Sequence, residues 1–171
     1  MGGKSFLQRG GTRFAAVLAF TAALAAALFL AGCQSVPVDP HGTLDRVSDG
    51  VMRVGASPNG EWVSLPPGGE PEGREADLVR DFAGKLNARI EWTTGTEYVL
   101  AEGIKHGELD LMIAGLNDKT PWEKHSGLTR GYTESTDERG TRHKHVMLIR
   151  QGENAFLLEL DKFLMEAMTS K

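Results

Sequence analysis

The chain has 171 residues, of which 40% are apolar and 25% are charged, the balance of a folded globular chain. A chain of this length holds about one domain, which excludes a multidomain enzyme. The net charge of -4 lacks the basic excess that nucleic-acid phosphates require, and one cysteine excludes an intramolecular disulfide or a site of several thiolates. We therefore expect one acidic domain with no nucleic-acid partner, no metal and no cofactor.

The N-terminal segment predicts export. Residues 1–13 contain three basic residues and no acid, and residues 14–31 are apolar apart from Thr21, a pattern typical of a secretory signal. The run ends at Leu30 to Cys33 (LAGC), which resembles the lipobox of bacterial lipoproteins, with the chain's only cysteine at the lipidated position. The alternative is an uncleaved membrane helix, because 18 apolar residues are near the lower limit for crossing a bilayer.

Processing before Cys33 predicts three parts: a signal peptide (1–32), a lipidated tether (33–42) and a lobe (43–171). Loss of the signal peptide removes three basic residues and no acid, which leaves 139 residues with a net charge of -7. A lipid anchor with several acyl chains attaches a protein to the membrane without a spanning helix. In Gram-negative lipoproteins an aspartate just after the lipidated cysteine resembles an inner-membrane retention signal, and here that position holds Gln34. We therefore expect the protein in the cell envelope, and in the outer membrane if the source is Gram-negative.

Strand and helix patterns alternate along the rest of the chain. Apolar residues recur at helical spacing from Glu75 onward, and Asn87 suits the end of that helix. Thr96 suits a helix start and Gly107 a helix end. The predicted elements, in chain order, are a strand at 51–55, a helix at 75–86, a strand at 89–92, a helix at 96–107, strands at 109–114 and 145–149, and a helix from Glu153 onward. Two successive βαβ units predict an α/β fold with a parallel sheet.

Several motifs, in the same order and spacing, resemble the first lobe of the bacterial extracellular solute-binding proteins of family 3, the polar amino-acid receptors of ABC transporters. They are residues 52–55 (MRVG), 73–79 (GREADLV), 107–116 (GELDLMIAGL) and 127–132 (GLTRGY). The resemblance covers nearly all of residues 43–164. It implies a single periplasmic-binding-protein-like lobe of type II, with a mostly parallel sheet of about five strands and helices on both faces.

The sequence departs from the family where the second lobe would be. Only eleven residues, 133–143, separate Tyr132 from Lys144, too few to build a second lobe. Asp137 to Gly140 have turn-forming composition, so we expect an antiparallel hairpin or a short loop here. The binding site would then be open to solvent, which predicts weak affinity for a free amino acid unless a partner supplies the other wall.

Ligands of open parallel sheets bind beyond the carboxyl ends of the strands, which places the candidate site there. The candidate ligand-binding residues are Asn59, Trp62, Glu75, Asp77, Gly115, Leu116, Asn117, Lys119, Trp122 and Tyr132. Family members that bind amino acids carry a Thr-x-x-Arg carboxylate clamp, but here its positions hold Lys119 and Trp122. Four of these assignments have a structural alternative: Glu75 and Asp77 as helix-start residues, Trp62 as a core lid, and Trp122 as a cap on the sheet end or a protein contact.

No catalytic motif accompanies these residues, so we predict a protein that is not an enzyme. His143 and His145 would share one face of a strand, but Arg142 and Lys144 beside them disfavour a metal. Two functions stay open. One is small-molecule binding by a lipid-anchored lobe, for import through an ABC permease. The other is an envelope scaffold, in which the same lobe docks another protein or a second copy of itself.

Overall fold

The computed structural model describes residues 37–169, so the predicted signal peptide (1–32) and the lipidation site Cys33 lie outside the described residues. The helices are α2 (Thr43–Val47), α3 (Arg74–Lys85), α4 (Glu97–His106), the short 3₁₀ helix η1 (Pro121–Lys124) and α5 (Asn154–Thr169). The strands are β1 (Val51–Ala56), β2 (Arg89–Thr94), β3 (Leu111–Ile113), β4 (Gly127–Leu128), β5 (Thr133–Thr136), β6 (Arg142–His145) and β7 (Leu148–Ile149). Within residues 37–169 no helix combines the length and the apolar character needed to cross a membrane.

The main sheet has five strands in the order β2-β1-β3-β7-β4. Strand β1 runs parallel to β2 and β3, while β7 runs antiparallel to β3 and β4. The antiparallel pair arises because β4 and β7 are connected through a hairpin, whereas parallel neighbours need a crossover connection such as a helix. The predicted five-stranded α/β lobe is confirmed, and its sheet is mixed, with the parallel part at the β2-β1-β3 side.

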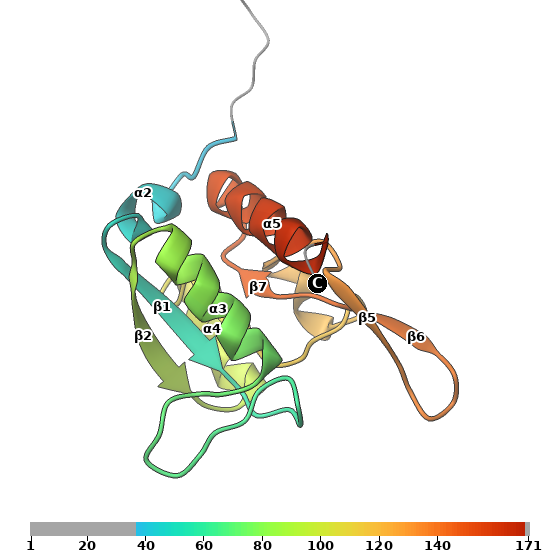
Figure 1. Cartoon of the computed structure of the whole chain (residues 1–171). Coiled ribbons are helices and arrows are strands. Elements are labelled where there is room, and N and C mark those ends of the chain that lie inside the picture. The colour runs from blue at the N-terminus through green and yellow to red at the C-terminus, as the bar shows by residue number, and fades with distance from the viewer. Residues whose placement is uncertain (1–36, 170–171) are drawn as a thin grey trace, which may run out of the picture. The chain divides into compact units, whose positions relative to one another are not determined.

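Helices cover both faces of this sheet, as predicted (Figure 1). On one face α3 and α5 pack together, with the ring centroids of Phe82 and Phe156 5.8 Å apart and those of Phe82 and Phe163 5.3 Å apart. On the other face Leu100 and Ile104 of α4 are buried in a second apolar cluster. The two clusters hold the sheet rigidly between the helices, so the loops at the strand ends have a fixed frame.

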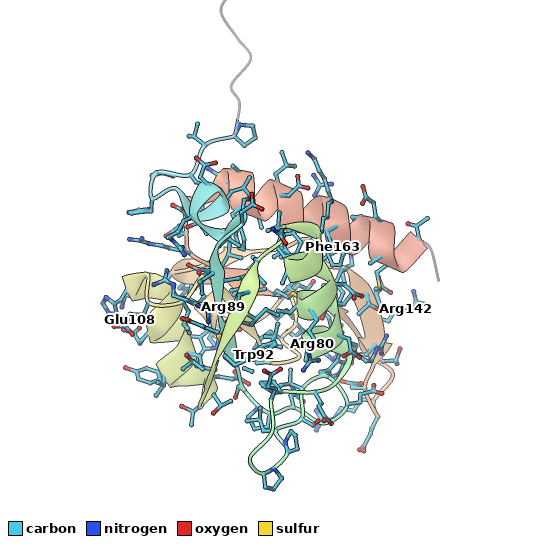
Figure 2. The ribbon with its side chains drawn as sticks, turned by 60° about the vertical axis from the view of Figure 1, so that its left-hand side comes forward. Arg80, Arg89, Trp92, Glu108, Arg142 and Phe163 are labelled. Atoms are coloured by element: carbon cyan, nitrogen blue, oxygen red, sulfur yellow. The ribbon has the colours of Figure 1, made fainter. Side chains whose placement is uncertain are left out.

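A contact between two side chains links α3 to the edge strand β2. Figure 2 shows Arg80 of α3 beside Trp92 of β2, and its guanidinium carbon lies 5.8 Å from the centre of the Trp92 rings. The predicted helix ends are also observed. Asn87 follows α3 with a φ of +52°, and Thr96 caps α4 by accepting a hydrogen bond from Val99 N–H.

The predicted strand at 145–149 is wrong, because this segment belongs to two different sheets. His145 ends β6, which pairs with β5 in the predicted antiparallel hairpin, and β7 starts only at Leu148. Between them Met147 N–H donates to the Thr129 hydroxyl (2.9 Å), and Thr129 N–H donates to Met147 O (3.0 Å). These bonds fix the change of direction where the chain passes from the hairpin into the main sheet.

The segment before α2 is tied to the start of α5 by two carboxylates. Asp39 accepts hydrogen bonds from Leu44 N–H (2.8 Å) and Ala155 N–H (2.7 Å), so one side chain serves the first turns of both helices. Glu153 accepts a hydrogen bond from Thr43 N–H (3.0 Å). Such bonds satisfy amide groups that a helix start leaves without an internal partner. The chain therefore joins the lobe firmly at this end.

Candidate functional site

A buried carboxyl group joins three segments of the predicted site. Glu75, in the first turn of α3, is fully buried. Its Oε2 accepts a hydrogen bond from Gly115 N–H (2.8 Å), in the loop after β3, and the Tyr132 hydroxyl donates to its Oε1. Tyr132 lies directly before β5. The structure therefore brings Glu75, Gly115 and Tyr132 together through hydrogen bonds to one another.

Burial also changes the acid–base properties of this group. Loss of water raises the pKa of Glu75 from 4.5 to about 7, although the hydrogen bonds from Tyr132 and Gly115 act in the opposite direction. Burial and the neighbouring Glu75 carboxyl also raise the pKa of Tyr132, which stays a neutral hydrogen-bond donor. Glu75 can therefore exchange a proton near neutral pH without leaving its buried position.

The loop after β1 packs against the same place. Asn59 Nδ2 donates a hydrogen bond to Ala114 O (2.7 Å). Gly115 has a φ of +59°, and a Cβ atom there would lie 2.8 Å from Asn59 Nδ2 and 2.9 Å from Trp62 Cβ. Only glycine fits both the backbone conformation and the space, because it has no Cβ. Asn59, Trp62 and Gly115 thus form one close-packed floor at the carboxyl ends of β1 and β3.

Trp62 is held between two other side chains. Its ring stacks on His145 with centroids 3.7 Å apart and an interplanar angle of 23°, and the Arg74 guanidinium carbon lies 4.5 Å from the Trp62 ring centre. His145 also shares a hydrogen bond of 2.7 Å with the Ser135 hydroxyl of β5. The stack connects the loop after β1, the start of α3 and the hairpin.

A small hollow of ≈ 130 Å³ opens beside this stack, between the start of α3, the end of α5 and the segment before β5. Three predicted ligand-binding residues, Trp62, Asp77 and Tyr132, line it. The complete lining is Trp62, Arg74, Asp77, Leu78, Asp81, Tyr132, Thr133 and Met168. It combines one guanidinium, two carboxylates and apolar walls, so it can hold a small molecule that carries both charges.

Seven of the ten predicted ligand-binding residues do not line this hollow. Asn59, Glu75 and Gly115 pack in the floor beneath it, and the other four lie elsewhere. The Leu116 side chain is buried in the apolar cluster under α4. Asn117 Oδ1 accepts a hydrogen bond from Lys119 N–H (2.9 Å), and the Lys119 side chain is exposed. Trp122 Nε1 donates to Glu97 Oε2 (3.4 Å), so Trp122 packs against the start of α4. Lys119 and Trp122 therefore stand apart from the stack around Trp62.

Sequence reasoning missed Arg74 and His145 as site residues. Arg74 lies inside the motif that supplied Glu75, but its side chain was given no role there. His145 was considered only as a metal ligand together with His143. In the structure His143 instead pairs with Asp137 (3.1 Å), and residues 37–169 contain no group of three or more His, Cys, Asp or Glu side chains placed to hold a metal.

The family model of the bacterial extracellular solute-binding proteins, family 3, matches residues 52–171. This chain belongs to that family. No curated protein sequence matches it significantly. The matched region contains the buried Glu75, the Gly115 loop and the Tyr132 segment.

Solved structures agree on the fold of this family 3 lobe. A point mutant of domain 1 of TmArgBP, the arginine-binding protein of T. maritima, in its arginine-bound form, has a TM-score of 0.65 and 18% identity, over 74% of this chain and 98% of that one. An ancestral cationic amino-acid solute-binding protein has a TM-score of 0.66 and 13% identity (75% and 94% covered). A periplasmic binding protein of Salmonella typhimurium with high arginine specificity has a TM-score of 0.60 and 10% identity (70% and 93% covered).

Proposed function

We propose that this protein is a lipid-anchored, single-lobe receptor that binds a small amino-acid-like solute and delivers it to an ABC importer. The observation that carries the proposal is the hollow beside Trp62, where Arg74, Asp77 and Asp81 meet apolar walls. An amino acid carries a carboxylate and an ammonium group on one carbon atom, and this lining offers a partner for each. The volume of ≈ 130 Å³ favours a small side chain.

Arg74 is the partner for the solute's carboxylate. Its guanidinium carbon lies over the Trp62 ring, and its ion-pair partner, Glu61, is 3.9 Å away and largely exposed. A surface pair of this length contributes little, so Arg74 can turn to a carboxylate and donate two parallel hydrogen bonds. Arg74 would thus supply the charge that the family's clamp arginine supplies elsewhere, from the start of α3 instead.

The acidic residues of the hollow are partners for the ammonium group. Asp77 pairs with Arg80 over 3.1 Å, but its side chain is still 74% exposed and keeps acceptor capacity. The Asp81 side chain, one turn further along α3, has no hydrogen bond or ion pair within the described part of the chain. Carboxylates accept several hydrogen bonds each, so both can contact the same ammonium group.

A single lobe is a sufficient scaffold for such binding. The isolated domain 1 of TmArgBP is described in an arginine-bound form, which supports a ligand-binding role for one lobe alone. A receptor of this kind works outside the cytoplasm, in agreement with the expected lipid anchor at Cys33. The open hollow suits a solute that is released easily to a permease.

A thermal unfolding screen of the full chain in a neutral detergent tests the proposal. We expect one or a few small amino acids at millimolar concentration to raise the unfolding temperature. A ligand at ten times its Kd stabilises the folded state by about 1.4 kcal/mol, which corresponds to roughly 5 °C for a lobe of this size. Arg74→Gln should abolish the shift, because the carboxylate partner is lost. Tryptophan fluorescence reports the transition.

Matched variants decide where the solute binds. Arg142→Gln removes the same charge from an 81% exposed side chain of β6 and should leave the shift intact. If Trp122→Ala abolishes the shift and Arg74→Gln does not, the site lies beside Lys119 and Trp122, and the assignment to the hollow is wrong. If no amino acid shifts the transition of the unmodified chain, the receptor function itself is contradicted.

One observation favours the second function, docking of a second copy. Tyr98 and Val99, at the start of α4, are 63% and 60% exposed, and Trp122 lies beside them with its ring centroid 6.0 Å from that of Tyr98. Grouped apolar side chains on a surface are typical of a contact site. If this function holds, analytical ultracentrifugation should detect a dimer that Val99→Lys dissociates, whereas Val38→Lys, at another exposed apolar residue, should not affect it.

A further inference from the structure

A second hollow lies at the opposite end of the lobe and is lined mainly by basic side chains. It has a volume of ≈ 340 Å³, and four separate segments contribute to it: the stretch before α2, the end of α4, the loop after η1 and the loop after β7. Its lining residues are His41, Lys105, His125, Arg150 and Gln151. No carboxylate lines this hollow, which distinguishes it from the one beside Trp62.

Two side chains of this hollow, those of Arg150 and His125, have their donors free for a ligand. His41 pairs with Glu153 over 2.8 Å, and Lys105 pairs with Glu102 over 3.1 Å. In contrast, Arg150 and His125 make no side-chain hydrogen bond or ion pair within residues 37–169. A half-buried guanidinium without a partner is unfavourable, since its donors have lost part of their water, and an anion bound there would supply the missing acceptors.

Arg150 lies against the turn that follows α4. Its guanidinium lies against Gly107, where a Cβ atom would come within 2.7 Å of the Arg150 Nη1. Gly107 follows α4 with a φ of +74°, a backbone conformation that favours glycine. The guanidinium therefore lies beside the end of α4, where Arg150 lines the hollow.

The hollow also lies where the chain enters the lobe. The arrowheads of β1 and β2 in Figure 1 point away from α2, so the hollow lies at the amino end of the parallel strands, opposite the Trp62 stack. His41, which lines the hollow, is eight residues after Cys33. Eight residues span at most roughly 28 Å, so a lipid at Cys33 would keep this end of the lobe close to a bilayer surface.

We propose that this basic hollow binds a phosphate oxyanion, and that its source is the headgroup of an anionic phospholipid. Arg150 donates paired hydrogen bonds to the phosphate oxygens, and His125 donates one more. The headgroup part rests on the proposed lipid anchor, while phosphate binding rests on the hollow alone. Neither part depends on solute binding at the opposite end. The contact would orient the lobe with its solute site directed away from the membrane.

NMR titration of the ¹⁵N-labelled full chain in a neutral detergent tests this proposal with three probes. They are inorganic phosphate, dihexanoyl phosphatidylglycerol and dihexanoyl phosphatidylcholine, all soluble. We expect saturable shifts of the Gly107 and Gln151 amides, with phosphatidylglycerol binding more tightly than phosphatidylcholine. Arg150→Gln should weaken binding about tenfold or more, because it removes a charge-assisted donor pair. His125→Gln, at an exposed residue, should weaken it less and retains the test if Arg150→Gln fails to fold.

Arg142→Gln is the matched control, because Figure 2 shows Arg142 on the far side of the lobe from Glu108, which follows α4. It should leave the affinity for phosphatidylglycerol unchanged. An equal loss in Arg142→Gln would mean that net charge alone attracts the lipid, and would overturn the site. Saturable binding of inorganic phosphate without a preference for phosphatidylglycerol would overturn the headgroup as the source. The absence of saturable shifts with all three probes would overturn the whole proposal.

Discussion

The Glu75 carboxyl should lower the free energy of unfolding by about 2.5 kcal/mol as the pH rises from about 5 to about 8, and Glu75→Gln should remove this contribution. Burial raises the pKa of Glu75 from 4.5 to about 7, so the folded lobe holds a proton that the unfolded chain releases. The stabilisation is complete below about pH 4.5 and is lost as the pH rises through about 7. Each unit of pKa difference corresponds to about 1.4 kcal/mol, which sets the expected size.

The measurement is urea unfolding at a series of pH values, compared between the unmodified chain and Glu75→Gln. Glutamine keeps the shape, can accept from Gly115 N–H and can turn its amide group to the Tyr132 oxygen. Comparison with the variant is needed because burial lowers the pKa of His145, which makes stability rise with pH in the acidic part of the range. Glu134→Gln, on the exposed face of β5, should keep the slope of the unmodified chain. Equal slopes in the unmodified chain and Glu75→Gln would show that Glu75 is not protonated when folded.

Local signals in the sequence predicted most of the elements. Asn87 and Gly107 end their helices, as their tolerance for positive φ indicated, and Thr96 begins α4. The hairpin was predicted from turn composition and from the short stretch of sequence between Tyr132 and Lys144. The strand at 145–149 was predicted wrongly, because five residues of strand-like composition carry no sign that the chain changes sheet within them. That change depends on bonds between Thr129 and Met147, which are distant in sequence.

The part of the candidate site that could be predicted consists of residues within the family motifs. Glu75, Gly115 and Tyr132 were selected from separate motifs, and the structure joins them through one carboxyl group. The stack of Arg74, Trp62 and His145 was not predictable, because no spacing rule relates three residues from a loop, a helix start and a hairpin. Side-chain stacking of this kind depends on tertiary packing alone.

Asp110→Ala should lower the free energy of unfolding by about 3 kcal/mol, although Asp110 lies far from the solute site. Its side chain is 2% exposed at the amino end of β3. It accepts from Arg53 Nη2 (2.6 Å), Arg53 N–H (2.9 Å) and Arg46 Nη1 (3.2 Å). Burial alone raises the pKa of Asp110, but the bonds from Arg53 and Arg46 hold it below its usual range. The group therefore stabilises the lobe while ionised, and this stabilisation is lost in acid.

Removal of a buried partner from an ion pair costs about 3–5 kcal/mol when the other charge stays buried. The Arg46 and Arg53 side chains are 41% and 34% exposed, so both can turn to water, and the low end of that range applies. Urea unfolding measures the loss, and Glu138→Ala in the exposed hairpin turn should change stability by less than about 0.5 kcal/mol. Asp110→Ala should also keep the solute-induced shift that Arg74→Gln loses, because the two residues lie at opposite ends of the parallel strands. A loss of solute binding with Asp110→Ala at a temperature where the lobe is still folded would contradict this separation of stability from binding.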